Sequence, residues 1–225
     1  MRSLQHDLDA FRHEFMAKTP VAIREAMARA DLLLAASGIT QRALQAGDRV
    51  PDFSLPDAVG NPWQLNEALL QGPVVLSFYR GGWCPYCNLT LRALQQVLLA
   101  IRKLGGQLVA LSPQTPDESL STVEKNELAF PVLSDIESKT ARAFGIAFEL
   151  AEELRPVYTQ FNHALPDKNG DASWTLPIPA TYVIDRDGIV RLAFQDTDYR
   201  NRLEPAEILR ALEALATNKE GPIHD

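Results

Sequence analysis

Cys84 and Cys87 are the only cysteines among the 225 residues, and they stand together in a CPYC tetrad. The tetrad follows an apolar run that ends at Tyr79, and a long amphipathic stretch begins near Asn88. This order predicts a buried strand, a short loop and a helix that starts at the cysteines. A chain with cysteines at one place builds no disulfide framework, so thiol chemistry at that helix start is the leading interpretation.

The spacing suits redox chemistry. With Cys84 at the N-cap and Pro85 at the first helical position, the Cys84 sulfur faces the unpaired amides and positive end of the helix, which favours its thiolate. Cys87 lies one turn further on and is placed to attack whatever forms on Cys84. Half of a zinc site is one alternative, but four scattered histidines make poor ligand partners. A pair of buried, inert cysteines is the other.

Composition narrows the classes of partner. The chain is 46% hydrophobic and 23% charged and carries a net charge of -7, which disfavours nucleic acid and anionic membranes. A chain of this length can bury a core that needs no metal or disulfide, and we expect no cofactor. The first twenty residues contain acidic side chains and no apolar core of a signal peptide, so we expect a cytoplasmic protein.

Residues 1–46 are predicted to be helical. An apolar stripe with helical spacing runs along the first stretch: Leu4, Leu8, Phe11 and Phe15. Pro20 opens a second helix that closes near Ser37-Gly38. A stripe of this kind usually packs within its own chain, so we expect the pair to cover the main domain; a dimerisation arm is the alternative.

From residue 47 onward, strand and helix patterns alternate. Residues 48–60 are rich in Pro, Asp and Gly and predict an extended, turn-rich entry. Strands are expected over 73–79, 107–111, 131–133, 181–184 and 189–194, and helices from the cysteines to Gly105, from Thr115 onward, over 138–144 and over 205–215. Asp187-Gly188 between the last two strands predicts a hairpin. Such alternation is typical of an α/β fold with crossover connections.

Several segments resemble a known family: DRVPDFSLPDAVGNPW at 48–63, FYRGGWCPYCN, LSPQTPD and IPATYVID. Together they resemble the redoxin group, which includes the AhpC/TSA peroxiredoxins and the TlpA-like disulfide reductases. They are most similar to peroxiredoxin-like proteins with CPYC at the peroxidatic position. The resemblance covers about 47–215 and implies a thioredoxin-like fold with a central mixed sheet flanked by helices. Residues 1–46 would be an N-terminal extension of a 47–217 domain, and 148–177 an insertion in it.

The family's peroxide-binding pattern is altered here. Peroxiredoxins typically carry P-x-x-x-T-x-x-C, and this chain has Ser77 and Gly81 at the Pro and Thr positions. The resemblance implies either that Arg80 and the Gly81 and Gly82 amides grip the peroxide instead, or that fast peroxide chemistry is lost. Arg80 has a second interpretation, as a surface arginine paired with a carboxylate. Pro179 occupies the position where the family has a late arginine.

Pro179 also resembles the cis-proline that faces the CxxC of thioredoxin-type proteins, which implies a cis Ile178–Pro179 bond beside a protein substrate. An ordinary trans proline at a strand start is the alternative. Thr181 is taken as a supporting residue. Trp83 would cover the disulfide or simply pack, and Tyr86 would bring its phenol near the sulfurs or face solvent.

Residues 148–177 form a connection longer than usual. They are predicted to form a lid, a substrate-binding surface or a dimer contact. The alternative is an ordinary long loop that contains a short helix at 151–161.

We favour an oxidoreductase of the thiol-peroxidase type, in which Cys84 attacks a peroxide and Cys87 resolves to an intramolecular disulfide. Thioredoxin or another dithiol would then reduce that disulfide. A thioredoxin-like exchange of protein disulfides is the alternative, and a redox-sensing module is a third class. A homodimer is compatible with each.

Overall fold

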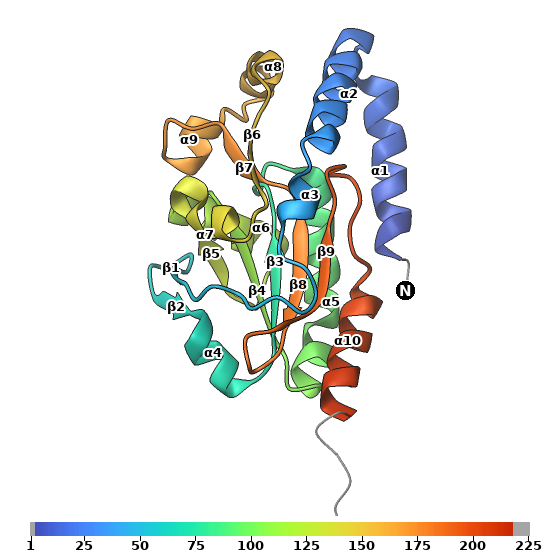
Figure 1. The fold of residues 1–225 in the computed structure, drawn as a ribbon. Helices are drawn as coiled ribbons and strands as arrows, with labels where there is room; N and C mark the ends of the chain where they lie inside the picture. The colour runs from blue at the N-terminus through green and yellow to red at the C-terminus, as the bar shows by residue number, and fades with distance from the viewer. Residues whose placement is uncertain (1–2, 218–225) are drawn as a thin grey trace, which may run out of the picture.

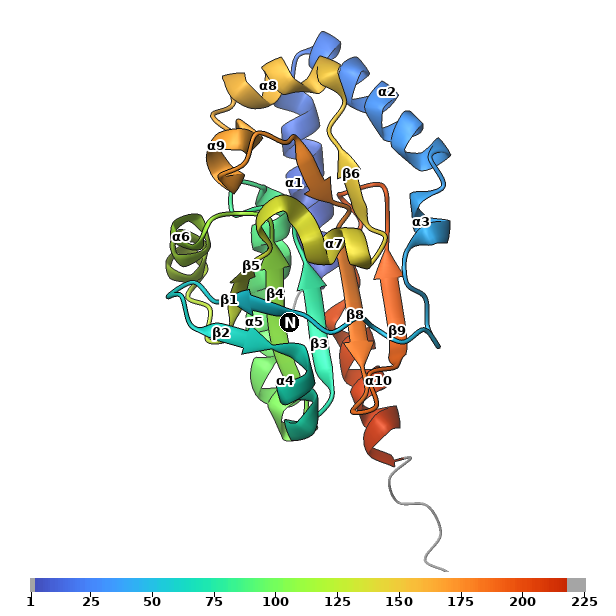
Figure 2. The ribbon, with the colours of Figure 1, turned by 60° about the vertical axis from the view of Figure 1, so that its left-hand side comes forward.

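A computed structural model describes residues 3–217, so residues 1–2 of the expected helical extension lie outside it. A five-stranded sheet with the order β5-β4-β3-β8-β9 occupies the centre, with helices on both faces (Figures 1 and 2). Strands β3, β4 and β5 are parallel, whereas β8 is antiparallel to both β3 and β9. The strands are β3 (Val74–Phe78), β4 (Gln107–Ser112), β5 (Val132–Ser134), β8 (Ala180–Ile184) and β9 (Val190–Gln195). The predicted α/β fold with a mixed sheet is confirmed.

The central strand β3 separates two hydrophobic cores, because successive side chains point to opposite faces of a sheet. Leu76 and Phe78 pack in the core beneath α4 (Leu65–Gln71) and α7 (Lys139–Ala143). Val75 packs in the other core, against α5 (Pro85–Lys103) and α10 (Pro205–Thr217). Helix α6 (Pro116–Asn126) packs beside β5. Because β3 is buried on both faces, its sequence is almost entirely apolar rather than alternating, and its one polar residue, Ser77, is buried as well.

The N-terminal extension folds as α1 (Leu4–Lys18), α2 (Val21–Ala36) and the single turn α3 (Ile39–Arg42). Leu4 and Leu8 are buried in the same core as α5, so the expected packing of the stripe within the chain is confirmed for α1. The backbone amides of Leu4 and Gln5 donate to the carboxylate of Glu204, which precedes α10. The start of the first helix is therefore anchored near the start of the last one.

Two peripheral β-ladders were not expected. The entry segment forms a hairpin from β1 (Ser54–Pro56) and β2 (Pro62–Gln64). The long connection begins with β6 (Ala147–Glu149) and ends with β7 (Thr175–Pro177), which pair antiparallel and close its base. Between them lie the 3-10 turn η2 (Glu152–Leu154), α8 (Arg155–Gln160) and α9 (Leu165–Asn169). The short helix expected over 151–161 is thus confirmed, and α4 is a helix that the sequence analysis missed.

None of the helices in residues 3–217 is long and apolar enough to cross a membrane.

Candidate active site

Both cysteines lie where β3 passes into α5. Cys84 is the N-cap of α5, Pro85 is its first residue, and the Asn88 amide donates to the Cys84 carbonyl at 3.1 Å. Both cysteines are free thiols, and their side chains are buried, with 1% of Cys84 and none of Cys87 exposed. The predicted strand, loop and helix therefore place the two sulfurs in one turn beneath the surface.

The loop before Cys84 is fixed by hydrogen bonds. The Gly82 amide donates to Gln114 Oε1 at 2.7 Å, and the Gly82 carbonyl accepts from Asn88 Nδ2 at 2.8 Å. A Cβ at Gly82 would lie only 2.1 Å from Thr122 Oγ1, so α6 touches the loop backbone. Because the Gly82 amide already donates its hydrogen to Gln114, it is not free to donate to a peroxide. The expectation that both glycine amides bind a peroxide is therefore wrong for Gly82.

Arg80 is a buried cation rather than a surface arginine. Only 4% of it is exposed, and it donates to the hydroxyl of Tyr158. Its guanidinium carbon lies 4.2 Å from the ring centroid of Tyr199 and 5.2 Å from that of Trp83. In residues 3–217 no carboxylate forms an ion pair with Arg80, so the alternative of a carboxylate-paired surface residue is wrong.

A buried charge needs a counter-charge, because desolvation makes an isolated ion costly. Burial alone lowers the pKa of Arg80, but interactions with Tyr158 and with the Cys84 and Cys87 thiols raise it overall. Arg80 therefore stays protonated, and the two thiols are among the nearby groups that can balance its charge, together with Tyr158 and the carboxylate of Asp31.

Arg202 approaches the thiol pair from another part of the chain. It lies between β9 and α10, and its Nη2 is 3.5 Å from Cys87 Sγ. Its Nη1 donates to the carbonyl oxygens of Tyr199 and Asn201, the latter at 2.7 Å, which orients the guanidinium. Arg202 was not predicted as a site residue, because the run DYRNR at 198–202 has the composition of an ordinary charged, solvent-exposed loop.

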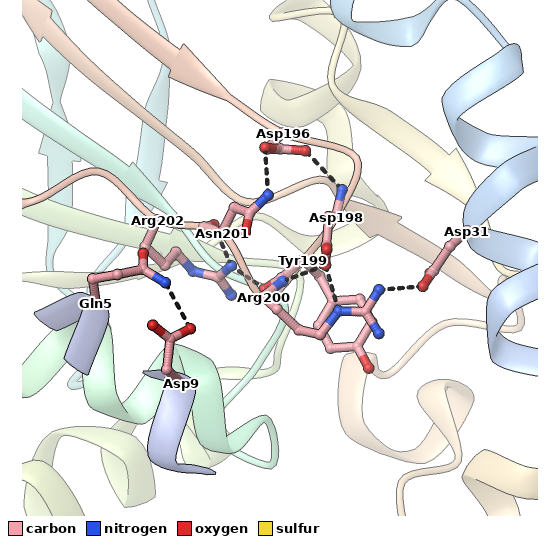
Figure 3. A network of polar contacts seen from close by, with 9 residues as sticks. All are labelled: Gln5, Asp9, Asp31, Asp196, Asp198, Tyr199, Arg200, Asn201 and Arg202. Atoms are coloured by element: carbon pink, nitrogen blue, oxygen red, sulfur yellow. Dashed lines mark hydrogen bonds and ion pairs between the residues drawn. The ribbon is translucent and has the colours of Figure 1, made fainter. Parts of the chain in front are cut away.

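The loop that carries Arg202 is braced against α2. Arg200 lies between two carboxylates and pairs with Asp31 of α2 at 2.5 Å and with Asp198 at 2.5 Å (Figure 3). Asp196 accepts a hydrogen bond from Asn201 Nδ2 at 2.9 Å in the same view (Figure 3). The N-terminal extension therefore contributes to the support of the active-site arginine.

The two arginines favour one negative charge on the thiol pair. Burial and a hydrogen-bond interaction with Cys87 raise the pKa of Cys84 well above its ordinary value. Burial also acts to raise the pKa of Cys87, but the hydrogen-bond interaction with Cys84 and the charges of Arg202 and Arg80 outweigh it and lower that pKa to about 5. The lowered pKa thus belongs to Cys87, whereas the sequence predicted it for Cys84.

Pro179 and Thr181 lie beside Cys87. With Arg202, they line a cavity of only about 10 Å³ next to that cysteine. The expected cis Ile178–Pro179 bond is wrong: no peptide bond in residues 3–217 is cis. The Ile178 amide donates to the Ile146 carbonyl at 2.8 Å, which extends the β6–β7 pairing up to Pro179, and β8 begins at the next residue.

Trp83 and Tyr86 form part of an aromatic wall around Cys84. The Trp83 ring contacts Tyr158 edge-on with centroids 5.5 Å apart. Tyr86 is 3% exposed and packs edge-on against Phe11 of α1 at 5.0 Å, so it does not face solvent. Burial raises the pKa of Tyr86 to about 12, which keeps its hydroxyl protonated.

In residues 3–217 no three side chains among histidine, cysteine, aspartate and glutamate converge where a metal ion would bind.

Residues 46–193 match the model of the AhpC/TSA family. The chain belongs to the AhpC/TSA family of peroxiredoxins. It is therefore a peroxiredoxin-type oxidoreductase, a thiol peroxidase that acts on peroxides.

Among curated peroxiredoxins, the chain is 33% identical over 104 residues to peroxiredoxin Bcp of Escherichia coli, covering 46% of this chain and 65% of that one. It is 27% identical over 174 residues to the chloroplastic peroxiredoxin Q of Sedum lineare, covering 75% of this chain and 78% of the relative. The solved structure of peroxidoxin BcpB from Mycobacterium tuberculosis matches 76% of this chain and 98% of that chain, with a TM-score of 0.61 and 24% identity. That likeness confirms the thioredoxin-like peroxiredoxin fold.

Proposed function

We propose that this peroxiredoxin uses Cys84 as its peroxidatic residue and Cys87 as its resolving residue, and that its product is an intramolecular disulfide. The observation that carries the assignment is the difference in space around the two sulfurs. Cys84 lies in the wall of a pocket of about 240 Å³, whereas the cavity beside Cys87 measures about 10 Å³. A cavity needs roughly 10–15 Å³ to hold one water, so a peroxide fits beside Cys84 only.

The lowered pKa of Cys87 fits this division of roles. The Cys84 proton passes to Cys87, and the Cys84 thiolate attacks the peroxide oxygen that bears hydrogen. An S–O bond forms, the O–O bond breaks, and the leaving alkoxide or hydroxide takes the proton from Cys87. Cys84 is then a sulfenic acid and Cys87 again a thiolate.

Resolution follows in the same turn of helix. The Cys87 thiolate attacks the sulfenic sulfur, an S–S bond forms, the S–O bond breaks, and hydroxide leaves and is protonated by solvent. An external dithiol then reduces the disulfide by exchange. Thioredoxin or a similar donor of the reducing cytoplasm fills this role.

The domain that carries this cycle comprises residues 47–217. Residues 1–46 are an N-terminal extension of it, and residues 148–177 are an insertion in it.

Exchange with protein disulfides is the weaker candidate, because the family to which the chain belongs is one of peroxidases.

Stopped-flow oxidation of the reduced protein by hydrogen peroxide, with mass spectrometry of the product, tests the assignment. We expect Cys84→Ser to abolish fast oxidation and Cys87→Ser to stop at a sulfenic acid on Cys84. If Cys84→Ser still reacts rapidly while Cys87→Ser does not, the roles are reversed. Oxidation of the native protein no faster than that of a free thiol would contradict the peroxidase cycle itself.

A further inference from the structure

A second cavity lies between α2 and the first part of the 148–177 insertion, and neither cysteine lines it. We call it the α2–β6 recess. Helix α2 contributes Ala30 and Leu34 to its walls, and the segment from β6 to η2 contributes Phe148 and Leu150. Its volume is about 360 Å³, and most of the residues that line it are apolar. Binding sites for small molecules typically measure roughly 300–1,000 Å³ and are mainly apolar, so the recess has the size and character of such a site.

The two sides of the α2–β6 recess are fastened to each other and to the rest of the protein. Ala26 of α2 packs in a small hydrophobic core with residues of the insertion. Arg29 of α2 pairs with Glu153 of η2 at 2.9 Å, and Asp31 pairs with Arg200 at 2.5 Å. The recess is therefore largely pre-formed, as sites for small molecules usually are.

The charged residues of the lining leave a positive charge to be matched. Its two acidic residues already pair with arginines from outside the lining: Asp31 with Arg200 at 2.5 Å, and Glu149 with Arg155 at 2.6 Å. Its two arginines, Arg42 and Arg80, form no ion pair within residues 3–217. Arg42 is exposed, whereas Arg80 is buried. The recess thus favours an anion, and most strongly at Arg80, where water screens the charge least.

Arg80 also has a hydrogen-bond donor to spare. A guanidinium carries five N–H donors, and the Arg80 side chain donates from Nη2 to the Tyr158 hydroxyl. Its Nε is buried and has no hydrogen-bond partner within residues 3–217, although 96% of the residue is buried, given its exposed fraction of 4%. An unpaired buried donor is costly unless a ligand satisfies it. A carboxylate matches a guanidinium in both charge and geometry, since two parallel N–H···O bonds can form.

The apolar walls add a requirement for the rest of the ligand. Burying an apolar group is favourable by roughly 25 cal/mol for each Å² removed from water. An apolar cavity of roughly 150 Å³ suffices to bind benzene, and the recess has about 360 Å³. A ligand that fits it therefore has a carboxylate at one end and an apolar body at the other.

We propose that the α2–β6 recess is a second binding site, which takes an apolar monocarboxylate with its carboxylate on Arg80 and its apolar body against Ala30, Leu34 and Phe148. The site is separate from the reacting sulfurs. Its existence does not depend on the roles assigned above to Cys84 and Cys87.

Occupancy of the recess is coupled to the redox state through Arg80, and this step rests on the disulfide of the proposed function. Arg80 interacts with the thiols of Cys84 and Cys87, and a disulfide carries no negative charge. The ligand's carboxylate therefore meets less competition for Arg80 in the oxidised protein and binds it more tightly. Because coupling between two equilibria is reciprocal, the bound carboxylate makes the disulfide harder to reduce. A tenfold difference in affinity corresponds to a reduction potential lower by about 30 mV at saturation.

The first test is calorimetric titration of the reduced protein with octanoate, with octanamide as the uncharged analogue and acetate as the analogue without an apolar body. We expect octanoate to bind roughly tenfold more tightly than either, because a hydrogen bond to a charged group contributes about 1.5–3 kcal/mol. Arg80→Met should bring the affinities for octanoate and octanamide close together. Arg42→Met, which removes the exposed arginine of the same recess, is the matched control and should largely keep the difference.

The second test fills the recess. Ala30→Phe on α2 and Ala151→Phe beside η2 each place a ring inside it, and we expect either to abolish measurable binding of octanoate. Ala28→Phe, at an exposed position of α2 outside the lining, is the matched control and should bind octanoate like the native protein. Two blocking positions on different segments keep the test decisive if one variant does not fold.

The outcomes separate the site from its coupling and from the peroxidase cycle. Octanoate that binds no more tightly than octanamide, or equally well in all three phenylalanine variants, overturns the site. Equal affinity of octanoate for the reduced and the peroxide-oxidised protein overturns the coupling and leaves the site intact. Failure of peroxide to produce the disulfide contradicts the proposed function alone, since binding to the reduced protein is measured without it.

Discussion

Arg202 places Nη2 3.5 Å from the sulfur of Cys87, although 115 residues separate the two in the chain. Peroxiredoxins have an arginine late in the chain beside the thiolate, and this sequence has Pro179 at that position, so no arginine was expected there. The loop after β9 supplies a guanidinium from a different place. With Arg80 from the end of β3, it gives the thiol pair two positive neighbours.

Replacing Arg202 should raise the pKa of Cys87, because its charge is among the causes that lower that pKa to about 5. Arg202→Met should therefore show a thiolate absorbance at 240 nm that appears at higher pH than in the native protein. Arg191→Met serves as the control, since Arg191 pairs with Asp185 on the half-exposed edge of the sheet. An unchanged titration in Arg202→Met would show that this contact does not stabilise the thiolate.

The rate of oxidation should depend on pH with a fall on the acid side. The pKa of Cys87 is lowered to about 5, so the pair keeps its thiolate above that pH and loses it as pH falls through it. We expect the rate constant for oxidation to be nearly constant from about pH 6 to 8 and to fall roughly tenfold per pH unit well below 5. A midpoint near 8.5, the value of an ordinary thiol, would contradict this reading.

Removing the charge of Arg80 should make the disulfide harder to reduce. Arg80 interacts with the thiolate of the reduced pair, and that interaction disappears when the disulfide forms. A stabilised reduced form raises the reduction potential, and a shift of about 30 mV corresponds to ~1.4 kcal/mol in a two-electron couple. Arg80→Met should lower the potential by at least about that amount in glutathione redox titrations, while Arg80→Lys should retain part of it. Equal potentials in all three proteins would show that Arg80 is balanced by another group.

A side chain at residue 82 should destabilise the protein through its contact with α6. The added Cβ would lie 2.1 Å from Thr122 Oγ1, and overpacking of this kind costs about 1–3 kcal/mol. We expect Gly82→Ala to lower the free energy of unfolding by about that much in urea titrations. Thr122→Ala removes the clashing oxygen. Gly82→Ala should therefore lower the free energy of unfolding less in the Thr122→Ala background than in the native protein. Strict additivity of the two changes would place the strain elsewhere.

Sequence reasoning predicted the elements whose signals are local. The strand before Cys84, the helix from Pro85, the hairpin at Asp187-Gly188 and the two N-terminal helices all follow from periodicity and turn residues that lie within a few positions of one another. The β6–β7 ladder was missed because each strand has only three residues and the two lie far apart in sequence, so neither shows a pattern of its own.

The candidate site was predictable only as far as its own segment extends. Arg80, Cys84 and Cys87 lie in one short segment of the sequence, so their closeness in space could be expected from it. The contributions of Phe11, Tyr158 and Arg202 depend on tertiary packing, which a charged or aromatic residue in isolation does not reveal. The trans bond at Pro179 was likewise not evident from the local sequence.

The anchoring of α1 by Glu204 and the position of Arg202 bear on how the enzyme is made. A ribosome delivers the chain from its N-terminus at roughly 5–20 residues per second, so both cysteines emerge long before the arginine that lies 115 residues beyond Cys87. The leading amides of the first helix likewise gain Glu204 as a partner only after residue 204 has been synthesised. A nascent chain that has not yet reached Arg202 therefore carries thiols that lack one of their two positive neighbours.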